Sequence, residues 1–208
     1  MVHILAVNSS LSGDGSVSRL LVEDALQELQ QFHPGATVTH RNVGLEPIPH
    51  LTPDTLLGVR GVPATAAERA TSDLSDRLIG EVQAADVIVI GSPMYNFSIP
   101  TGLRSWFDHV IRPRVTFGYS EGGVQGFITG KRVIVVQSRG GLYTEGESAH
   151  MDFQEPYLRT LLGFIGLTDI TFVHAERIGF GPEAREAAIA GARAQIAAAV
   201  ARPVSVAA

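Results

Sequence analysis

The segment Val2–Ser18, VHILAVNSSLSGDGSVS, predicts a β-strand that runs through a polar loop into a helix. Val2–Val7 is a short apolar run containing β-branched residues, which favours a buried strand. Asn8–Ser18 is rich in hydroxyls and glycines, and apolar residues then recur at helical spacing as far as Phe32. A strand that leads into a helix through a loop is the first half of a βαβ unit, so the segment indicates an α/β fold.

The same alternation continues along the chain. Further strands are expected at Thr37–Asn42, Ala85–Gly91, Arg132–Gln137 and Asp169–His174, and further helices at about 66–84, 101–111, 156–164 and 183–201. The first, third and fourth strands are continuous apolar runs, as in strands covered on both faces, whereas the second and fifth carry polar residues, as edge strands can. We therefore predict a flavodoxin-like, doubly wound parallel sheet of five strands in the order 2-1-3-4-5, with helices on both faces.

Length and composition narrow the class of protein. A chain of 208 residues suits one domain, which we expect to span 1–208 with a frayed tail after about residue 203. The absence of cysteine excludes disulfides, thiolate metal sites and thiol nucleophiles. A net charge of −5 without a long basic run argues against nucleic-acid and anionic-membrane partners. No apolar run approaches the ~20 residues of a membrane span, and no signal peptide is visible, so we expect a cytoplasmic protein.

Three loops should meet beyond the carboxyl ends of the strands, where sheets of this order bind ligands. Asn8–Ser18 leads into a helix, whose unpaired N–H groups and partial positive charge suit a phosphate. Ser92–Ile99 carries Met94, Tyr95 and Phe97, which could pack on a flat ring. Ser138–Tyr143 offers consecutive glycine amides to a ring carbonyl. Each loop alone could be an ordinary helix cap or turn, but their agreement favours a ligand site.

Two segments break the alternation of strands and helices. Gly44–Ala64 contains four prolines, and Pro113–Gly130 is rich in glycine and aromatic residues. Segments of this length without regular structure are usually lids or binding loops, although a surface insertion without a role is the alternative.

The seven histidines show no metal-ligand spacing, so we predict no metal site. A serine hydrolase is disfavoured because no G-x-S-x-G motif is present.

Several motifs make the chain resemble the FMN-dependent NADH-azoreductases, a family that includes NAD(P)H:quinone oxidoreductases. They are PMYNF at Pro93–Phe97, Trp106-Phe107-Asp108, Val115-Thr116-Phe117, SRGG at Ser138–Gly141, and GFIG at Gly163–Gly166 with Thr168-Asp169. The resemblance implies a flavodoxin-like homodimer with FMN in two sites near the subunit interface. It further implies reduction of azo compounds to aromatic amines and of quinones to hydroquinones by NADH or NADPH, in a ping-pong, two-electron mechanism.

The resemblance also assigns site residues. The FMN contacts carry over onto Ser10, Ser16, Val17, Ser18, Met94, Tyr95, Asn96, Phe97, Ser138, Arg139, Gly140 and Gly141. Tyr119 and Phe164 match positions that line the substrate cleft. Apart from the resemblance, Arg60 is the only Lys or Arg in Gly44–Ala64 and could meet a nucleotide phosphate or an anionic dye, with a solvated surface arginine as the alternative. No catalytic residue is assigned.

The chain departs from the family pattern at two places. Val124–Phe127 replaces a frequent Gly-Pro…Gly-Leu pattern, which puts the shape of the substrate lid in doubt. Arg177-Ile178-Gly179 after Glu176 replaces a smaller, uncharged run, and we expect this change to matter only to the surface. Two alternative functions remain: a quinone reductase with incidental azo activity, and a flavodoxin-type electron carrier without a small-molecule substrate.

Overall fold

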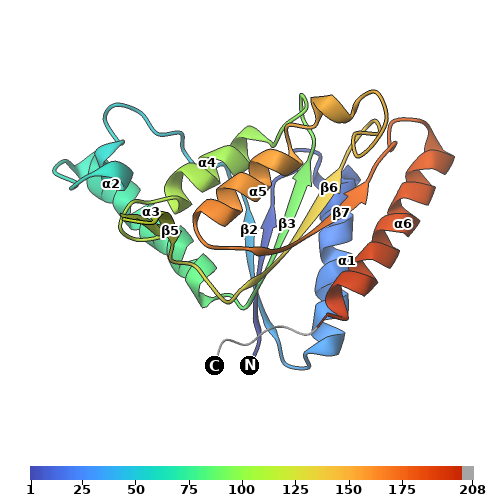
Figure 1. Cartoon of the computed structure of the whole chain (residues 1–208), viewed down its shortest axis with the longest axis horizontal. Coiled ribbons are helices and arrows are strands. Elements are labelled where there is room, and N and C mark those ends of the chain that lie inside the picture. The colour runs from blue at the N-terminus through green and yellow to red at the C-terminus, as the bar shows by residue number, and fades with distance from the viewer. Residues whose placement is uncertain (203–208) are drawn as a thin grey trace.

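The computed structural model describes residues 1–202, so the predicted fraying after residue 203 lies outside the described residues. Its centre is a five-stranded parallel sheet in the order β2-β1-β3-β6-β7 (Figure 1). The strands are β1 (His3–Asn8), β2 (Thr37–Asn42), β3 (Val87–Pro93), β6 (Arg132–Ser138) and β7 (Asp169–Ala175). The predicted parallel sheet of five strands is confirmed.

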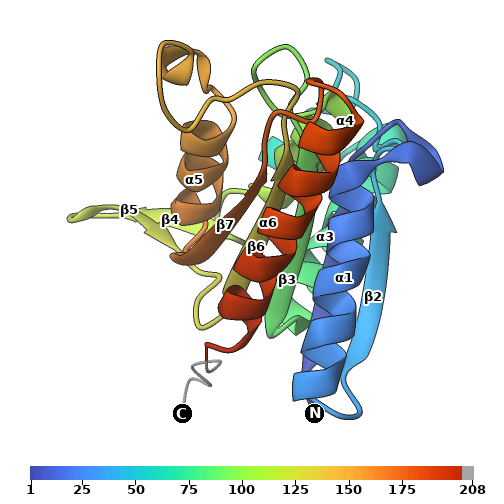
Figure 2. The same cartoon turned by 90° about the vertical axis from the view of Figure 1, so that its right-hand side faces the viewer.

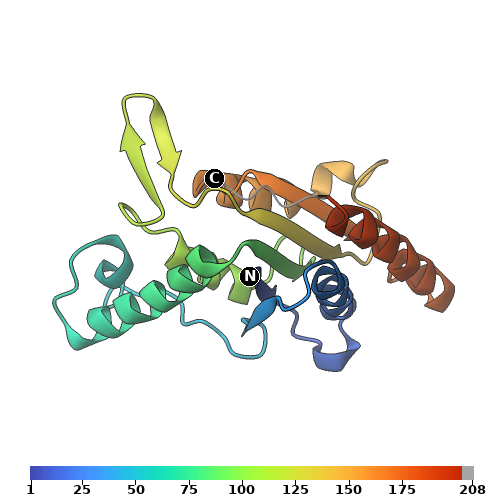
Figure 3. The same ribbon diagram turned by 90° about the horizontal axis from the view of Figure 1, so that it is seen from below.

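The numbering of the last two strands corrects the predicted order 2-1-3-4-5. Between α4 and β6 the chain forms an antiparallel hairpin of β4 (Phe117–Ser120) and β5 (Gly123–Gly126), which the sequence did not predict. The sheet strands expected as fourth and fifth are therefore the sixth and seventh along the chain. Figures 2 and 3 show the hairpin projecting away from the main sheet.

Helices cover both faces of the sheet, as predicted. Helices α1 (Val17–Phe32) and α6 (Pro182–Val200) pack side by side on one face, and α3 (Ala66–Ala84), α4 (Thr101–Val110) and α5 (Glu155–Phe164) pack on the other (Figure 2). The short α2 (Leu57–Arg60) packs on α3, and two 3₁₀ turns lie at Gly13–Gly15 and Ala149–Met151. Trp106 of α4 is fully buried in the apolar core between the sheet and the layer formed by α3, α4 and α5. Within residues 1–202, no helix has the length and hydropathy to span a membrane.

Strand polarity reports correctly on position in the sheet. Every residue of β3 and β6 is buried, because these central strands have a helix layer on each side. The edge strand β2 has no fully buried residue, and its sequence TVTHRN is mostly polar. Burial of aliphatic strand residues on both faces contributes about 25 cal/mol per Å² of apolar surface, so it favours this order over one with β2 inside.

Backbone contacts tie the loops together at the carboxyl edge of the sheet. The Ser9 amide donates to the Gly91 carbonyl at 3.1 Å, and the Met94 amide donates to the Ser138 carbonyl at 2.8 Å. Gly44, which follows β2, approaches the first loop so closely that a Cβ there would lie 2.2 Å from the Ser10 carbonyl oxygen. A glycine is therefore required at this contact.

We expect Gly44→Ala to destabilise the protein by about 1–3 kcal/mol, because the added methyl group must displace the backbone of the first loop. Gly80→Ala is the matched control, since Gly80 lies on the exposed side of α3 and its Cβ would meet nothing within 4 Å. That control should be neutral or stabilising by up to ~1 kcal/mol. Urea unfolding of both variants measures the difference, and equal effects would contradict the close contact.

Candidate functional site

The loops after β1, β3 and β6 line one cavity of about 180 Å³ at the carboxyl edge. Its lining consists of Ser10, Ser12, Gly15, Ser16, Val17, Pro93, Met94, Tyr95, Ser138, Gly140, Ile178 and Arg185. Each of the three predicted loops contributes to this list. The structure thus brings together loops that are separated by as many as 130 residues in the sequence.

The first loop presents hydroxyls and amides to the cavity. Ser16 is the N-cap of α1, and its hydroxyl accepts from the Arg19 amide at 3.2 Å. The Ser18 hydroxyl lies 3.2 Å from that of Ser16. The first amides of a helix have no partner within the helix, so Val17 and Ser18 add backbone donors to these hydroxyls. Ser16 is therefore both a helix cap and part of the cavity wall. The sequence left open whether this loop is an ordinary helix cap or part of a ligand site, and the two roles are compatible.

The second loop is a two-residue hairpin turn in a strained conformation. Tyr95 and Ser98 exchange backbone hydrogen bonds of 3.0 and 3.1 Å, and Asn96 and Phe97 between them have φ angles of +46° and +69°. Both angles are left-handed, which Asn tolerates and Phe does not readily adopt. Strain of this kind costs about 1–3 kcal/mol per residue and is found mostly at functional sites. The turn leaves Phe97 43% exposed beside the cavity rim at Tyr95.

Tyr95 fastens the second loop to the first. Its hydroxyl accepts from the Leu11 amide at 3.2 Å. Burial raises the pKa of Tyr95, but hydrogen bonds from Ser10, Leu11 and Ser12 outweigh it, so the pKa lies below its usual value. The phenol therefore acts as an acceptor for the first loop.

The two glycines of the third loop differ in their surroundings. A Cβ on Gly140 would meet nothing within 4 Å, so open space adjoins this residue at the cavity. A Cβ on Gly141 would instead lie 3.2 Å from the Tyr143 ring. The space next to Gly140 is therefore open, whereas the space next to Gly141 is filled by Tyr143 of the same loop.

Arg139 does not line the cavity, although we predicted it as a cofactor contact. Its side chain is completely buried beneath the third loop. The guanidinium group pairs with Asp152 at 2.9 Å and Glu176 at 3.2 Å, and it donates to Gln137 at 2.8 Å and Gln154 at 3.1 Å. The side chain therefore supports the loop from within. The Arg139 backbone is engaged as well, because its amide donates to the Ala175 carbonyl at 2.9 Å and its carbonyl accepts from the Ile178 amide at 3.2 Å.

Glu176 begins the segment whose departure from the family pattern we expected to matter only to the surface, and it is a central part of this support. Besides Arg139, its carboxylate accepts from the amides of Tyr143 and Thr144 at 2.8 and 3.1 Å and from the Thr144 hydroxyl at 2.6 Å. Burial raises the pKa of Glu176, but these hydrogen bonds and Arg139 outweigh burial and hold the pKa below its usual value. The expectation was wrong because the partners of Glu176 lie more than 30 residues away in sequence.

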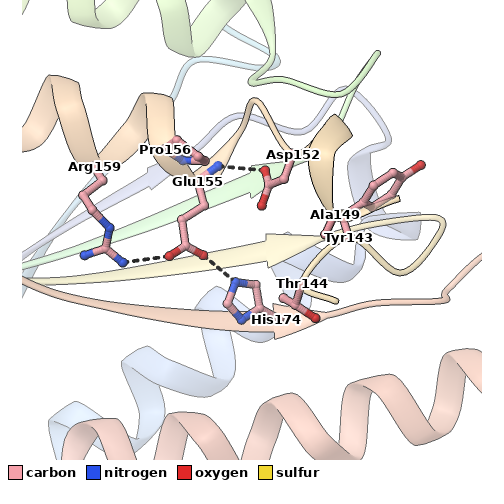
Figure 4. Close-up of a pocket in the computed structure, with 8 residues that line it drawn as sticks. All are labelled: Tyr143, Thr144, Ala149, Asp152, Glu155, Pro156, Arg159 and His174. Atoms are coloured by element: carbon pink, nitrogen blue, oxygen red, sulfur yellow. Dashed lines mark hydrogen bonds and ion pairs between the residues drawn. The ribbon is translucent and has the colours of Figure 1, made fainter. Parts of the chain in front are cut away.

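A larger cavity of about 560 Å³ lies between α5 and the edge strand β7 (Figure 4). Glu155 is at its centre and contacts His174 at 2.8 Å and Arg159 at 2.7 Å. The hydrogen bond from His174 is the main cause that lowers the pKa of Glu155. These polar groups satisfy one another, whereas none of the three predicted loops except the end of the third, at Tyr143, reaches this cavity.

Tyr119 and Phe164 lie away from the three loops of their own chain. Phe164 ends α5 shortly before β7 begins, so it lies toward the amino edge of the sheet. Its ring centroid is 4.6 Å from that of Phe117, which in turn is 5.8 Å from that of Tyr119. We placed both residues near the proposed cleft, and within one chain they are not there.

Arg60, which we predicted to contact a nucleotide or a dye, does not line the cavity of the three loops and has a structural partner instead. It donates to the Ile111 carbonyl, which caps the end of α4, and so its charge lies next to the negative end of that helix.

Sequence reasoning also missed Arg185 and Ile178, which line the cavity from the segment after β7. The rule that placed the other loops at the carboxyl edge applies equally to this one, so the position of the segment was predictable. The residues themselves carried no motif that singled them out.

Among residues 1–202, no group of three or more His, Asp or Glu side chains could hold a metal ion.

We expect Glu176→Gln to lower the free energy of unfolding by about 3 kcal/mol at pH 7, because it removes one charge from a buried pair. The pKa of Glu176 in the folded protein lies below 4.5, so its contribution is present above that pH and is lost as the pH falls through the folded pKa. The difference between variant and parent should therefore shrink below about pH 4. Urea unfolding at several pH values measures it.

Glu147→Gln is the matched control, because Glu147 is exposed in the neighbouring loop and forms no ion pair within residues 1–202. It should change stability by less than ~0.5 kcal/mol at every pH. Similar losses in the two variants would contradict the role of Glu176.

A family model described as the flavodoxin-like fold matches residues 2–200 of the chain. The chain is 56% identical over 197 residues to the FMN-dependent NADH:quinone oxidoreductase of Hyphomonas neptunium, with 95% of each protein covered. It is 46% identical over 196 residues to FMN-dependent NADH:quinone oxidoreductase 3 of Pseudomonas aeruginosa, with 93% of this chain and 90% of the relative covered.

A solved structure gives the same result. The crystal structure of an azoreductase from Bacillus anthracis superimposes with a TM-score of 0.87 at 27% identity, covering 96% of this chain and 99% of the other. The fold, the sequence identities and the convergence of the three loops all indicate the same family. The chain therefore belongs to the flavodoxin-like family that contains the FMN-dependent NADH:quinone oxidoreductases.

Proposed function

We propose that the protein is an FMN-dependent NAD(P)H oxidoreductase that reduces quinones to hydroquinones and azo compounds to aromatic amines. The observation that carries the proposal is the convergence of three loops on one cavity lined with hydroxyls and glycine. The names of its relatives support the quinone activity, and the azoreductase neighbour supports the azo activity. The same names disfavour an electron carrier without a small-molecule substrate.

The donors at the cavity fit the phosphate end of FMN. Ser10 and Ser16 line the cavity with hydroxyls, and the Ser18 hydroxyl lies 3.2 Å from that of Ser16. The first turn of α1 adds amides with a partial positive charge. A P-loop would hold its phosphates with a lysine, and no lysine lines this cavity. A single phosphate group matches this donor set better than a di- or triphosphate.

The second and third loops fit a flat ring that carries carbonyl groups. The amides of Asn96, Phe97, Gly140 and Gly141 donate to no acceptor within residues 1–202, so they are available to ring carbonyls. When bound, FMN supplies the two-electron chemistry between NAD(P)H and the acceptor. Fixed amides stabilise negative charge without reorganisation, so these loops favour the reduced state of the ring. The Arg139 and Glu176 network holds the third loop in position for this task.

We also propose that residues 1–208 form one FMN-binding domain that pairs with a second copy. Its two apolar cores lie on opposite faces of one sheet, which supports the single domain. Tyr119 is 78% exposed on the projecting hairpin, and Phe164 lies next to it through Phe117. If these aromatic residues cover an acceptor, they reach it across a two-fold interface in the partner's site. A cytoplasmic location stays a prediction of the sequence.

The test of the proposed function is the visible spectrum of the purified protein. We expect a bound flavin that bleaches when NADH is added without oxygen and recovers when a quinone follows. Steady-state rates at several NADH and quinone concentrations should give parallel double-reciprocal lines, because the two substrates use one site in turn. Recovery of the flavin only with a protein electron acceptor would favour the carrier instead.

A double variant tests whether the flavin occupies the predicted cavity. Ser16→Ala with Ser18→Ala should lose roughly 1–3 kcal/mol of bonding to the phosphate, which weakens FMN binding by one to two orders of magnitude. Ser120→Ala is the matched control, since within residues 1–202 the only hydrogen bond of its hydroxyl is to the Gly123 carbonyl of the distant hairpin. Unchanged FMN affinity in the double variant would show that these serines serve only as helix caps.

We expect Tyr119→Ala to reduce quinone and dye turnover several-fold and unequally between acceptors, because an aromatic contact contributes ~0.5–1.5 kcal/mol beyond burial. FMN affinity should not change, since Tyr119 lies outside the three loops. Mixing the Tyr119 variant with the serine double variant should restore part of the turnover if the cleft is shared between subunits. No restoration in mixed dimers verified by size and mass would contradict the shared cleft.

A further inference from the structure

Arg185 brings a positive charge to a cavity that otherwise lacks charge. It lies in the first turn of α6, and it is the one charged residue among those that line the cavity within residues 1–202. The other lining groups are hydroxyls, glycines and apolar side chains. An anion that enters the cavity therefore meets a cation and no opposing carboxylate in the lining.

The guanidinium group of Arg185 has no protein partner. Neither an ion pair nor a side-chain hydrogen bond engages it within residues 1–202. Arg193 on the same helix, by contrast, pairs with Asp24 at 2.8 Å, and Arg139 below the third loop has two carboxylates. A half-buried guanidinium with unused donors is suited to bidentate recognition of a phosphate.

The backbone around Arg185 reinforces this charge. The N-cap of α6 is Gly181, which has no side chain to cap the first turn, and Ser16 begins α1 at the same cavity. Two helices thus begin beside the cavity, and their N-terminal dipoles favour an anion there. Glu183 and Glu186 flank Arg185 in sequence, but both are exposed and neither lines the cavity.

We propose that Arg185 recognises the phosphate group of the flavin and makes the site select FMN over riboflavin. The proposal rests on the proposed function above, because it takes FMN as the ligand. The serine hydroxyls and amides supply hydrogen bonds that a neutral group could also accept. Arg185 adds a positive charge that attracts a phosphate group and has no matching group in riboflavin. Its contribution is therefore measured as the difference between the affinities for FMN and for riboflavin.

The experiment is a titration of the full-length protein, freed of flavin, with FMN and separately with riboflavin, followed by flavin fluorescence. Arg185→Ala should raise the Kd for FMN roughly five- to tenfold, the size expected for one partly exposed charge-assisted contact. The Kd for riboflavin should stay within about twofold, since that flavin carries no phosphate. Arg185→Lys should recover part of the FMN affinity, because it retains the charge without the planar fork.

Arg193→Ala is the matched control, because it removes an arginine from the same helix whose partner is Asp24 and not a ligand. It should leave the FMN-to-riboflavin ratio of the parent unchanged. The inference is overturned if Arg185→Ala leaves this ratio unchanged, or weakens both flavins equally. Failure of the parent protein to bind either flavin would instead overturn the proposed function, so the two failures are distinguishable.

Discussion

A single buried guanidinium group organises the carboxyl edge of the sheet. Arg139 extends from the end of β6 to Asp152 and Glu176, and through Gln154 it is linked to the Ser92 carbonyl of the second loop. Charges in a dry environment are costly unless they are fully paired, so the loops cannot move apart without exposing or orphaning this cation. The site thus owes its shape to a residue that does not line the cavity.

This constraint explains which parts of the site the sequence could predict. The three loops were predictable because strand polarity and alternation place the carboxyl ends of parallel strands together, and this rule needs only local patterns. The serines at the start of α1 followed from the chemistry of helix N-termini. Glu176 and Arg185 were not predictable in the same way, since their roles depend on partners or cavities assembled from distant segments.

The hairpin of β4 and β5 marks a second limit of local reasoning. Its segment is rich in glycine, which favours an irregular loop by composition, yet Gly126 packs so closely on Gly166 that only glycine fits. The position of Tyr119 and Phe164 was inferred from resemblance, which identifies residues without placing them in the fold. Knowing the direction in which α5 runs would have placed Phe164 at the amino edge.

Under the proposed function, the turn at Asn96 and Phe97 sets the stability of the backbone against contact with a ligand. Asn-Gly is the pair that suits two left-handed residues in a hairpin, so replacing Phe97 with glycine would relieve backbone strain. The same change would remove an exposed aromatic side chain from the rim of the cavity. A redesign that optimised thermal stability alone would therefore change this position, and under the proposed function it should leave the position untouched.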